Sequence, residues 1–211
     1  MTDRPATRRL FIALPLPETA RAAVADIIEQ VRADVGEGSG VRWVRTDGLH
    51  LTLRFLGHTT TERAIDVESV VAAAAAATAP IDLVLAGAGA FPSPARPRVL
   101  WIGVTAGGER VADLVEELGR GLAPLGWPPE ERPYRAHLTL ARTDGAPGGR
   151  ATAARLSEVA GGVRIVCAAS QLALMESHTG RGPARYTTLF PATLAGEPRD
   201  PYAQRPESEE D

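Results

Sequence analysis

The feature that most constrains this chain is a tetrapeptide that occurs twice. His-Leu-Thr-Leu stands at residues 50–53 and again at residues 137–140. A predicted strand and an amphipathic helix precede each copy, and a further predicted helix follows it. Before the first copy, the strand is predicted at residues 9–14 and the helix at 18–35, and the helix after it at 61–78. Before the second copy, the strand is predicted at 98–105 and the helix at 108–125, and the helix after it at 150–159. Self-similarity of this kind predicts a duplicated unit, so we expect two pseudo-equivalent lobes facing each other across a cleft.

The remaining segments complete an α+β pattern. Strands are predicted at 41–44, 81–86, 163–176 and 185–194, with a turn at residues 87–89 and a long Pro-rich loop at residues 91–97. The fold class is therefore α+β: a bilobal, pseudo-two-fold duplicated fold, with antiparallel sheets and flanking helices around a central cleft. Residues 1–195 are expected to form this single domain with two interleaved lobes, and residues 196–211 an acidic, disordered tail.

The charge of the chain is concentrated at its end. The formal net charge is −3, and every one of the 23 basic residues is Arg. Residues 196–211 hold six acidic residues and two Arg, which leaves the preceding 195 residues at +1. A nearly neutral body favours an enzyme that holds one phosphate locally over a protein that coats long RNA. Arginine suits such a phosphate site because its guanidinium offers a planar fork of donors.

Several protein classes do not match the sequence. No apolar run approaches the roughly 20 residues that span a bilayer, and the N-terminus lacks an apolar signal core. We therefore expect a cytoplasmic protein with no membrane partner. The single cysteine, Cys167, lies in an apolar stretch and predicts a buried structural thiol, not a disulfide or a cysteine-rich metal site. Neither tetrapeptide includes a carboxylate or a cysteine, so we expect no metal and no cofactor.

The repeated tetrapeptide has the residues for acid–base chemistry. On a strand, His50 and Thr52 project from one face, and so do His137 and Thr139 in the second copy. Two facing lobes would bring two imidazoles and two hydroxyls together. One neutral histidine can then take a proton from a nucleophile while a protonated one gives a proton to a leaving oxygen. A single His-x-Thr-x strand is usually structural, but two copies in duplicated contexts favour a catalytic pair.

These motifs resemble those of a known family. The similarity covers about residues 8–194 and is carried by residues 9–17, 49–57, 91–94, 98–101 and 137–142. Together they resemble the 2H phosphoesterase superfamily, and within it the bacterial and archaeal RNA 2′,3′-cyclic phosphodiesterases, also called 2′-5′ RNA ligases. The resemblance implies metal-independent hydrolysis of a 2′,3′-cyclic phosphate to a 2′-phosphomonoester, with 2′-5′ RNA ligation as a weak side reaction. Ala136 departs from the pattern, since the family favours Pro before the second motif histidine.

The resemblance also implies a role for each motif residue. His50 would be the general acid that protonates the leaving 3′ oxygen, and His137 the general base that activates water. Thr52 and Thr139 would bind the phosphate oxygens. A pseudo-symmetric cleft can in principle run in either direction, so the acid and base assignments stay open at this point.

Further candidates surround the two motifs. Arg54 and Arg135 share the faces of the motif histidines, whereas Arg142 points to the cleft only if a bulge near Ala141 re-aims it. We expect these three arginines to contact phosphate or RNA backbone. The aromatic candidates for base stacking are Trp43, Tyr134 and Tyr186, while the odd offset of Phe55 from His50 predicts that Phe55 packs in the core.

Two alternatives remain open beside the RNA phosphodiesterase. A non-catalytic module could bind RNA ends through the same cleft, although binding alone has no need of titratable pairs. A phosphodiesterase for small cyclic nucleotides would use the same catalytic residues. The expected partners are RNA ends or small cyclic-phosphate nucleotides, and the chain is expected to be a monomer.

Overall fold

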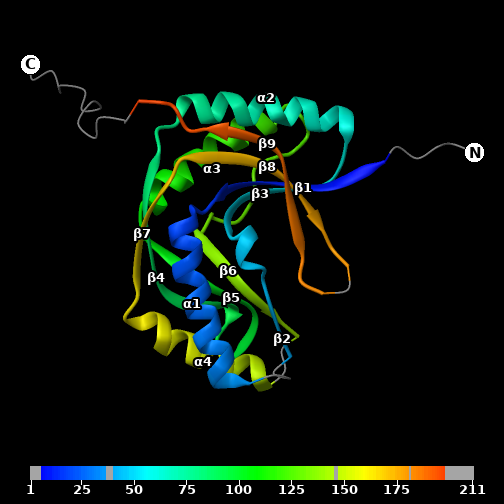
Figure 1. Cartoon of the computed structure of the whole chain (residues 1–211). Helices are drawn as coiled ribbons and strands as arrows, with labels where there is room; N and C mark the ends of the chain where they lie inside the picture. Colours follow the sequence, from blue (N-terminus) through cyan, green and yellow to red (C-terminus); the bar gives the residue numbers. More distant parts are fainter. Residues whose placement is uncertain (1–5, 37–39, 145–146, 181, 198–211) are drawn as a thin grey trace, which may run out of the picture.

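Nine strands and four α-helices form within the described part of the chain. The computed structural model describes residues 6–36, 40–144, 147–180 and 182–197 (Figure 1). In chain order the elements are β1 (Thr7–Pro15), α1 (Glu18–Val35), β2 (Val41–Trp43), a 3-10 turn (Thr46–Gly48), β3 (His50–Thr60), α2 (Thr61–Ala77), β4 (Ile81–Ser93), β5 (Arg96–Ala106), α3 (Gly108–Leu122), β6 (His137–Thr143), α4 (Pro147–Gly161), β7 (Arg164–Ala169), β8 (Gln171–His178) and β9 (Arg185–Thr193).

The strands form one curled antiparallel sheet with two equivalent halves. Its order is β7-β4-β5-β6-β3-β1-β8-β9, and β2 pairs with β6 beside this path. From the centre outward, one half reads β3-β1-β8-β9 and the other β6-β5-β4-β7. The two central strands share a single register pair, Leu51 with Leu138, and both of these side chains are fully buried. The α+β class and the antiparallel pairing are thus confirmed, while the predicted separate sheets are joined at this point.

The two halves exchange strands and helices. β4 follows the first motif unit in the chain but pairs with β5, and β8 follows the second unit but pairs with β1. Helix α2 packs on the β3-β1-β8-β9 half, and α1 and α4 pack on the other half, while α3 lies against α2 and contacts β3, β4 and β5 (Figure 1). Each half therefore holds segments from both repeats, and neither half can form its core alone.

The sheet has apolar side chains on both faces, in unequal amounts. The larger cluster lies between the sheet and the helices, where α1 contributes the predicted stripe of Ala20, Val24, Ile27, Ile28 and Val31. A small second cluster lies on the face opposite the helices, made of Phe11, Ala13, Ala173 and Met175 with Tyr186 against it. This second cluster forms an apolar floor on the concave side of the sheet.

Two predictions of non-strand structure, the turn at residues 87–89 and the loop at residues 91–97, are wrong. Residues 87–89 and the Pro-rich segment 91–97 lie mostly in β4 and β5, which meet in a tight hairpin. Gly87 adopts φ +64° beside a register shift in the ladder, so a bulge replaces the predicted turn. A Cβ on Gly89 would clash with the indole of Trp101, so the glycine makes room for that ring.

The predicted strand over residues 163–176 is in fact two strands. β7 ends at Ala169 and pairs with β4, whereas β8 begins at Gln171 and pairs with β1. An apolar run cannot reveal this division, because apolar residues continue through both parts. The two parts lie in different halves of the sheet.

The ends of the chain are only partly described. Ala195 and Gly196 are bonded to the C-terminal end of α2: the Ala195 N–H donates to the Ala75 carbonyl and the Gly196 N–H to the Thr78 carbonyl, each at 3.1 Å. The rest of the predicted tail, residues 198–211, lies outside the described residues, as do residues 1–5. The single-domain boundary at residue 195 stays a prediction. None of the described helices combines the length and apolar character required to cross a bilayer.

Candidate active site

Matching bulges in the two motif strands decide which side chains reach the concave face. In β3 the first unpaired residue after the motif histidine is Leu53, and in β6 it is Leu140, each three positions after that histidine. A bulge reverses the alternation beyond it. Arg142, five positions after His137, consequently points to the cleft, which confirms the re-aiming predicted for a bulge near that point. Phe55, five positions after His50, follows the same rule, so the prediction that it packs in the core is wrong: Phe55 is 56% exposed.

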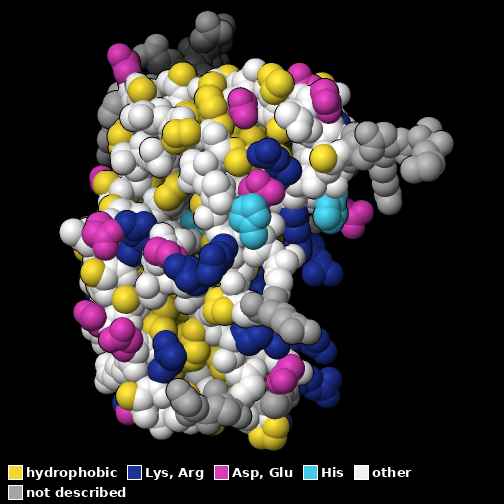
Figure 2. Space-filling model, turned by 45° about the vertical axis from the view of Figure 1, so that its right-hand side comes forward, with side chains coloured by type: hydrophobic (Ala, Val, Ile, Leu, Met, Phe, Trp, Pro, Cys, Tyr) yellow, Lys and Arg dark blue, Asp and Glu magenta, His cyan; other side chains and the backbone are white. Residues whose placement is uncertain are grey.

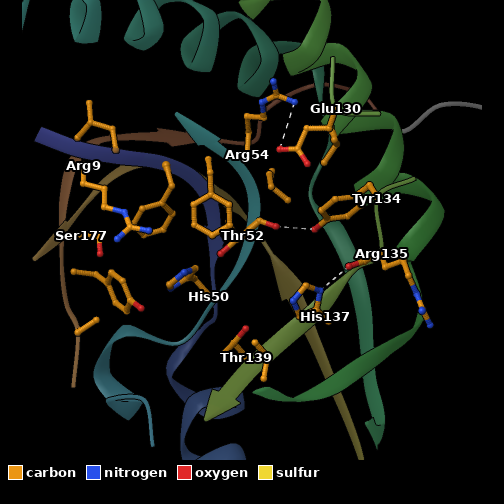
Figure 3. A pocket seen from close by; sticks show the side chains of 18 of the residues that line it. Arg9, His50, Thr52, Arg54, Glu130, Tyr134, Arg135, His137, Thr139 and Ser177 are labelled. Carbon is orange, nitrogen blue, oxygen red and sulfur yellow. Dashed lines mark hydrogen bonds and ion pairs between the residues drawn. The ribbon is translucent and has the colours of Figure 1, made fainter. Parts of the chain in front are cut away.

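The two motifs meet in one large cleft. His50, Thr52, His137 and Thr139 all line a cavity of about 1610 Å³ on the concave face, and Figure 3 shows them projecting from β3 and β6 into the same space. All four are partly buried. The cleft lining also includes each of the six other site residues predicted from sequence: Trp43, Arg54, Tyr134, Arg135, Arg142 and Tyr186.

Both histidines are held in the same way by backbone carbonyls. The His50 Nδ1 lies 2.6 Å from the Gly48 carbonyl oxygen, and the His137 Nδ1 lies 2.7 Å from the Arg135 carbonyl oxygen. A carbonyl oxygen only accepts, so each Nδ1 carries the hydrogen and donates it. In the neutral imidazole this leaves Nε2 as an acceptor, and in the protonated form Nε2 becomes a donor. Each ring can therefore either take or give a proton at Nε2.

The environment favours neutral imidazoles in the unliganded cleft. Burial lowers the pKa of His50, and the hydrogen bond to the Gly48 carbonyl opposes this in part. Burial also lowers the pKa of His137, against its bond to the Arg135 carbonyl, and the positive charges of Arg135 and Arg142 lower that pKa further. Cationic neighbours thus act on His137 and are absent from the causes of the His50 shift.

Aromatic rings support both histidines, and of the four rings concerned the sequence analysis selected only Tyr186. Phe11 lies 4.9 Å from the His50 ring between centroids, and Tyr186 contacts the same imidazole edge-on at 4.8 Å. Phe91 meets the His137 ring edge-on at 5.0 Å, with Trp101 further away at 6.4 Å. Phe11 could have been found by the face it shares with neighbouring strand positions, but the position of Phe91 depends on the β4–β5 register.

Three of the predicted substrate contacts have protein partners in the cleft wall. The Arg54 guanidinium donates to the Pro128 carbonyl and lies 3.5 Å from the Glu130 carboxylate (Figure 3). The Tyr134 hydroxyl donates to the Thr52 carbonyl at 3.0 Å, and burial raises the pKa of this phenol. Arg135 reaches over the Phe91 ring at 5.7 Å. Contacts of these residues with substrate stay a prediction.

The described residues contain no cluster of three or more His, Cys, Asp and Glu side chains arranged to hold a metal ion. Cys167 is a free, buried thiol on β7, and burial raises its pKa. Its position matches the structural thiol expected from sequence.

Comparison with known proteins identifies the family. The model of the LigT-like phosphoesterases matches residues 14–101 and residues 102–185. The chain belongs to the LigT-like phosphoesterase family. The first matched segment of this phosphoesterase carries His50 and Thr52, and the second carries His137 and Thr139, so each segment provides one half of the candidate active site.

Related proteins share most of this chain. A Thermus thermophilus protein named RNA 2′,3′-cyclic phosphodiesterase is 33% identical over 94% of this chain and 96% of its own length. An Aeropyrum pernix protein of the same name is 32% identical over 77% of this chain and 91% of its own. A crystal structure from Thermus thermophilus superposes with a TM-score of 0.70 at 29% identity, covering 90% of this chain and 99% of the other. Escherichia coli LigT complexed with 3′-AMP gives 0.67 at 27% identity, with the same coverage.

Proposed function

We propose that this phosphoesterase hydrolyses 2′,3′-cyclic phosphates at RNA ends to 2′-phosphomonoesters. The observation that carries the proposal is the paired arrangement of His50 and His137, each with Nδ1 on a backbone carbonyl and Nε2 available to one cleft. The names of the related proteins support the same reaction. A module that only binds RNA ends has no use for two such matched titratable rings.

The reaction divides between the two histidines. Nε2 of His137 takes a proton from water as the water oxygen attacks phosphorus, and a new P–O bond forms. The bond from phosphorus to the 3′ oxygen breaks, and Nε2 of His50 gives that oxygen its proton. The Thr52 and Thr139 hydroxyls donate to the nonbridging oxygens, where negative charge increases in the transition state. The product keeps its phosphate on the 2′ oxygen.

The charges around the cleft support this direction of proton transfer. Arg135 and Arg142 lower the pKa of His137 beyond the effect of burial, which favours the neutral form that a base requires. The pKa of His50 is lowered by burial alone, and a bound phosphate anion would raise it toward the protonated form that an acid requires. His50 as the acid and His137 as the base is therefore the assignment we propose.

The first experiment identifies the reaction. The protein is incubated with an oligoribonucleotide 2′,3′-cyclic phosphate in EDTA, and the position of the product phosphate is read by phosphorus NMR. We expect a 2′-phosphate, with His50→Ala and His137→Ala each slower by about three orders of magnitude or more. The control is His58→Ala, because His58 is not among the residues that line the cleft and its ring lies within hydrogen-bond distance of the Thr7 hydroxyl instead. No turnover, or a strict requirement for added metal, would contradict the proposal.

A second experiment assigns the acid and the base. A substrate with sulfur in place of the bridging 3′ oxygen has a leaving group that departs without protonation. We expect it to restore much of the activity of His50→Ala and little of that of His137→Ala. The reverse pattern would exchange the two roles. When a ribose hydroxyl replaces water, the same pair of histidines would form a 2′-5′ bond, and this ligase activity stays a prediction.

A further inference from the structure

A groove continues the cleft on the side of His137 that faces away from His50. Its volume is about 970 Å³, and its lining shares His137, Phe91, Tyr134 and Arg135 with that of the cleft. The sheet order explains its position, because β6, which carries His137, lies between β5 and the strand β3 that carries His50. Figure 3 shows the Arg135 side chain extending from beside His137 in the direction away from His50. His137 therefore stands at the boundary between the cleft and the groove.

The floor of the groove carries little side-chain bulk next to His137. Gly103 on β5 is the register partner of His137, and Ala86 on β4 is the register partner of Gly103. Neighbouring strands lie about 4.8 Å apart, so this bare strip extends about 10 Å beyond His137. The rings of Trp101 and Phe91 line the groove beside it. One water molecule occupies only about 30 Å³, so the groove is far larger than hydrolysis requires and has the size of a small-molecule site.

The lining of the groove suits a nucleotide. Trp101 and Phe91 lie 5.2 Å apart between ring centroids and offer aromatic surface on which a base can stack. The buried Nε1–H of Trp101 has no hydrogen-bond partner in the described part of the chain, a cost that a phenylalanine would not carry and that functional sites commonly accept. Arg135 is exposed, lies over the Phe91 ring at 5.7 Å and pairs with no described carboxylate, so its guanidinium is available to a phosphate. Figure 2 shows arginine side chains beside the histidines on the face it displays, where an anionic strand meets favourable charge.

The direction of the reaction decides what can enter this groove. In phosphoryl transfer the attacking and leaving oxygens lie roughly in line, on opposite sides of phosphorus. His50 protonates the leaving 3′ oxygen in the proposed mechanism, so the nucleophile approaches from the His137 side. An alcohol that replaces water therefore brings the rest of its molecule to that side of the phosphate, where the groove begins.

We propose that the groove binds the first nucleoside of an RNA strand with a free 5′-hydroxyl, which competes with water for the cyclic phosphate. This inference rests on the proposed function. Nε2 of His137 takes the proton of the 5′-hydroxyl as its oxygen bonds to phosphorus, the bond from phosphorus to the 3′ oxygen breaks, and Nε2 of His50 protonates that oxygen. The product is a 2′-5′ phosphodiester. The base of the bound nucleoside stacks on Trp101, and Arg135 contacts the phosphate on its 3′ oxygen.

The test measures how acceptors compete with water. Adenosine 2′,3′-cyclic phosphate is the donor, and the acceptors are methanol, cytidine and the dinucleotide CpA, each with a primary hydroxyl. Chromatography gives the ratio of transferred to hydrolysed product per mole of acceptor. We expect this ratio to be about 100-fold higher for CpA than for methanol, with cytidine between them, because only a nucleotide gains stacking and a charge-assisted contact. Equal ratios for CpA and methanol would overturn the subsite, and equal ratios for CpA and cytidine would overturn the contact of Arg135 with an RNA strand.

Two variants locate the bound acceptor. Ala86→Leu fills the groove two strands away from His137, so hydrolysis and transfer to methanol should stay unchanged while the advantage of CpA shrinks to about tenfold or less. Trp101→Leu removes the stacking surface and should also lower the ratio. The matched control is Ala168→Leu, the same change at an exposed position of β7 outside the groove, which should keep the full advantage. An advantage that survives in Ala86→Leu and Trp101→Leu would overturn the subsite and leave the proposed function in place. Absence of hydrolysis in the wild-type protein without any acceptor would overturn the proposed function and the subsite with it.

Discussion

The Tyr134 hydroxyl is expected to hold the two motif strands at their working separation. It donates to the Thr52 carbonyl at 3.0 Å, and Tyr134 itself lies three residues before His137. The carbonyl of the next residue, Arg135, accepts the Nδ1 hydrogen of His137. Because β3 and β6 share only the register pair of Leu51 and Leu138, the phenol provides a second connection between them. Tyr134→Phe removes this connection and keeps the ring.

The size of the effect follows from the burial of the hydrogen bond. Losing a donor to a largely enclosed carbonyl costs about 1–3 kcal/mol in general. We expect the lower end, about 1 kcal/mol of unfolding free energy, because the cleft gives water access to the Thr52 carbonyl. A small displacement of His137 relative to Thr52 should lower kcat about five- to tenfold while KM changes little, since the bound nucleotide keeps its contacts.

The assay separates positioning from base stacking, the role that the sequence predicts for Tyr134. Steady-state kinetics on an oligonucleotide 2′,3′-cyclic phosphate are compared for Tyr134→Phe and Tyr134→Leu, with denaturant unfolding of each variant. Positioning predicts that Phe already loses kcat. Stacking predicts that Phe retains both constants and that only Leu raises KM. Wild-type kcat and stability in Tyr134→Phe would refute the reasoning.

Three further predictions use other parts of the cleft and its support. Because burial lowers the pKa values of His50 and His137 from 6.5, the unfolded chain binds more protons than the folded protein as the pH falls below 6.5. The contribution of these histidines to the unfolding free energy is therefore complete above pH 6.5 and decreases at lower pH, by up to about 1.4 kcal/mol per pH unit for each histidine. Urea unfolding at several pH values measures this decrease. The variants His50→Gln and His137→Gln should each reduce that slope. Phe55→Ala should raise KM up to about tenfold, because the exposed ring lines the cleft. The unfolding free energy should change by less than about 0.5 kcal/mol. An unchanged KM would show that Phe55 does not contact the substrate. Leu138→Ala should lower the unfolding free energy by about 3 kcal/mol, because it truncates a fully buried side chain where the two halves of the sheet meet. Urea denaturation measures this loss, and a loss under about 1 kcal/mol would show that this side chain contributes little to holding the two halves together.

Structural features that depend on nearby residues can be predicted from local patterns in the sequence. The apolar spacing after Glu18 predicts α1 with its observed bounds, Glu18–Val35. The alternation around each tetrapeptide places both histidines and both threonines on one face, and the repeat itself indicates that these faces meet. Each of these features depends on neighbours only a few residues away, so the sequence contains the information directly.

Features that depend on distant strand partners cannot be predicted in the same way. The alternation in β3 assigns Phe55 to the core, because the bulge at Leu53 depends on the register with β1, which the sequence of β3 does not reveal. The prediction of one strand over residues 163–176 fails for a similar reason, since its two parts find partners in opposite halves of the sheet. The carbonyl contacts of Arg54 and Tyr134 likewise join residues more than 70 positions apart.

The paired bulges also explain how a nearly symmetric cleft can work in one direction. Each bulge brings the residue five positions after the histidine onto the cleft face, but that residue is aromatic in one repeat and cationic in the other. Phe55 adds to the aromatic surface around His50, whereas Arg142 places a positive charge within range of His137. A nearby cation favours the neutral imidazole, and a neutral imidazole is what a general base must be. The backbone is duplicated, and the different side chains at this one position support the proposed assignment of the base to the second repeat.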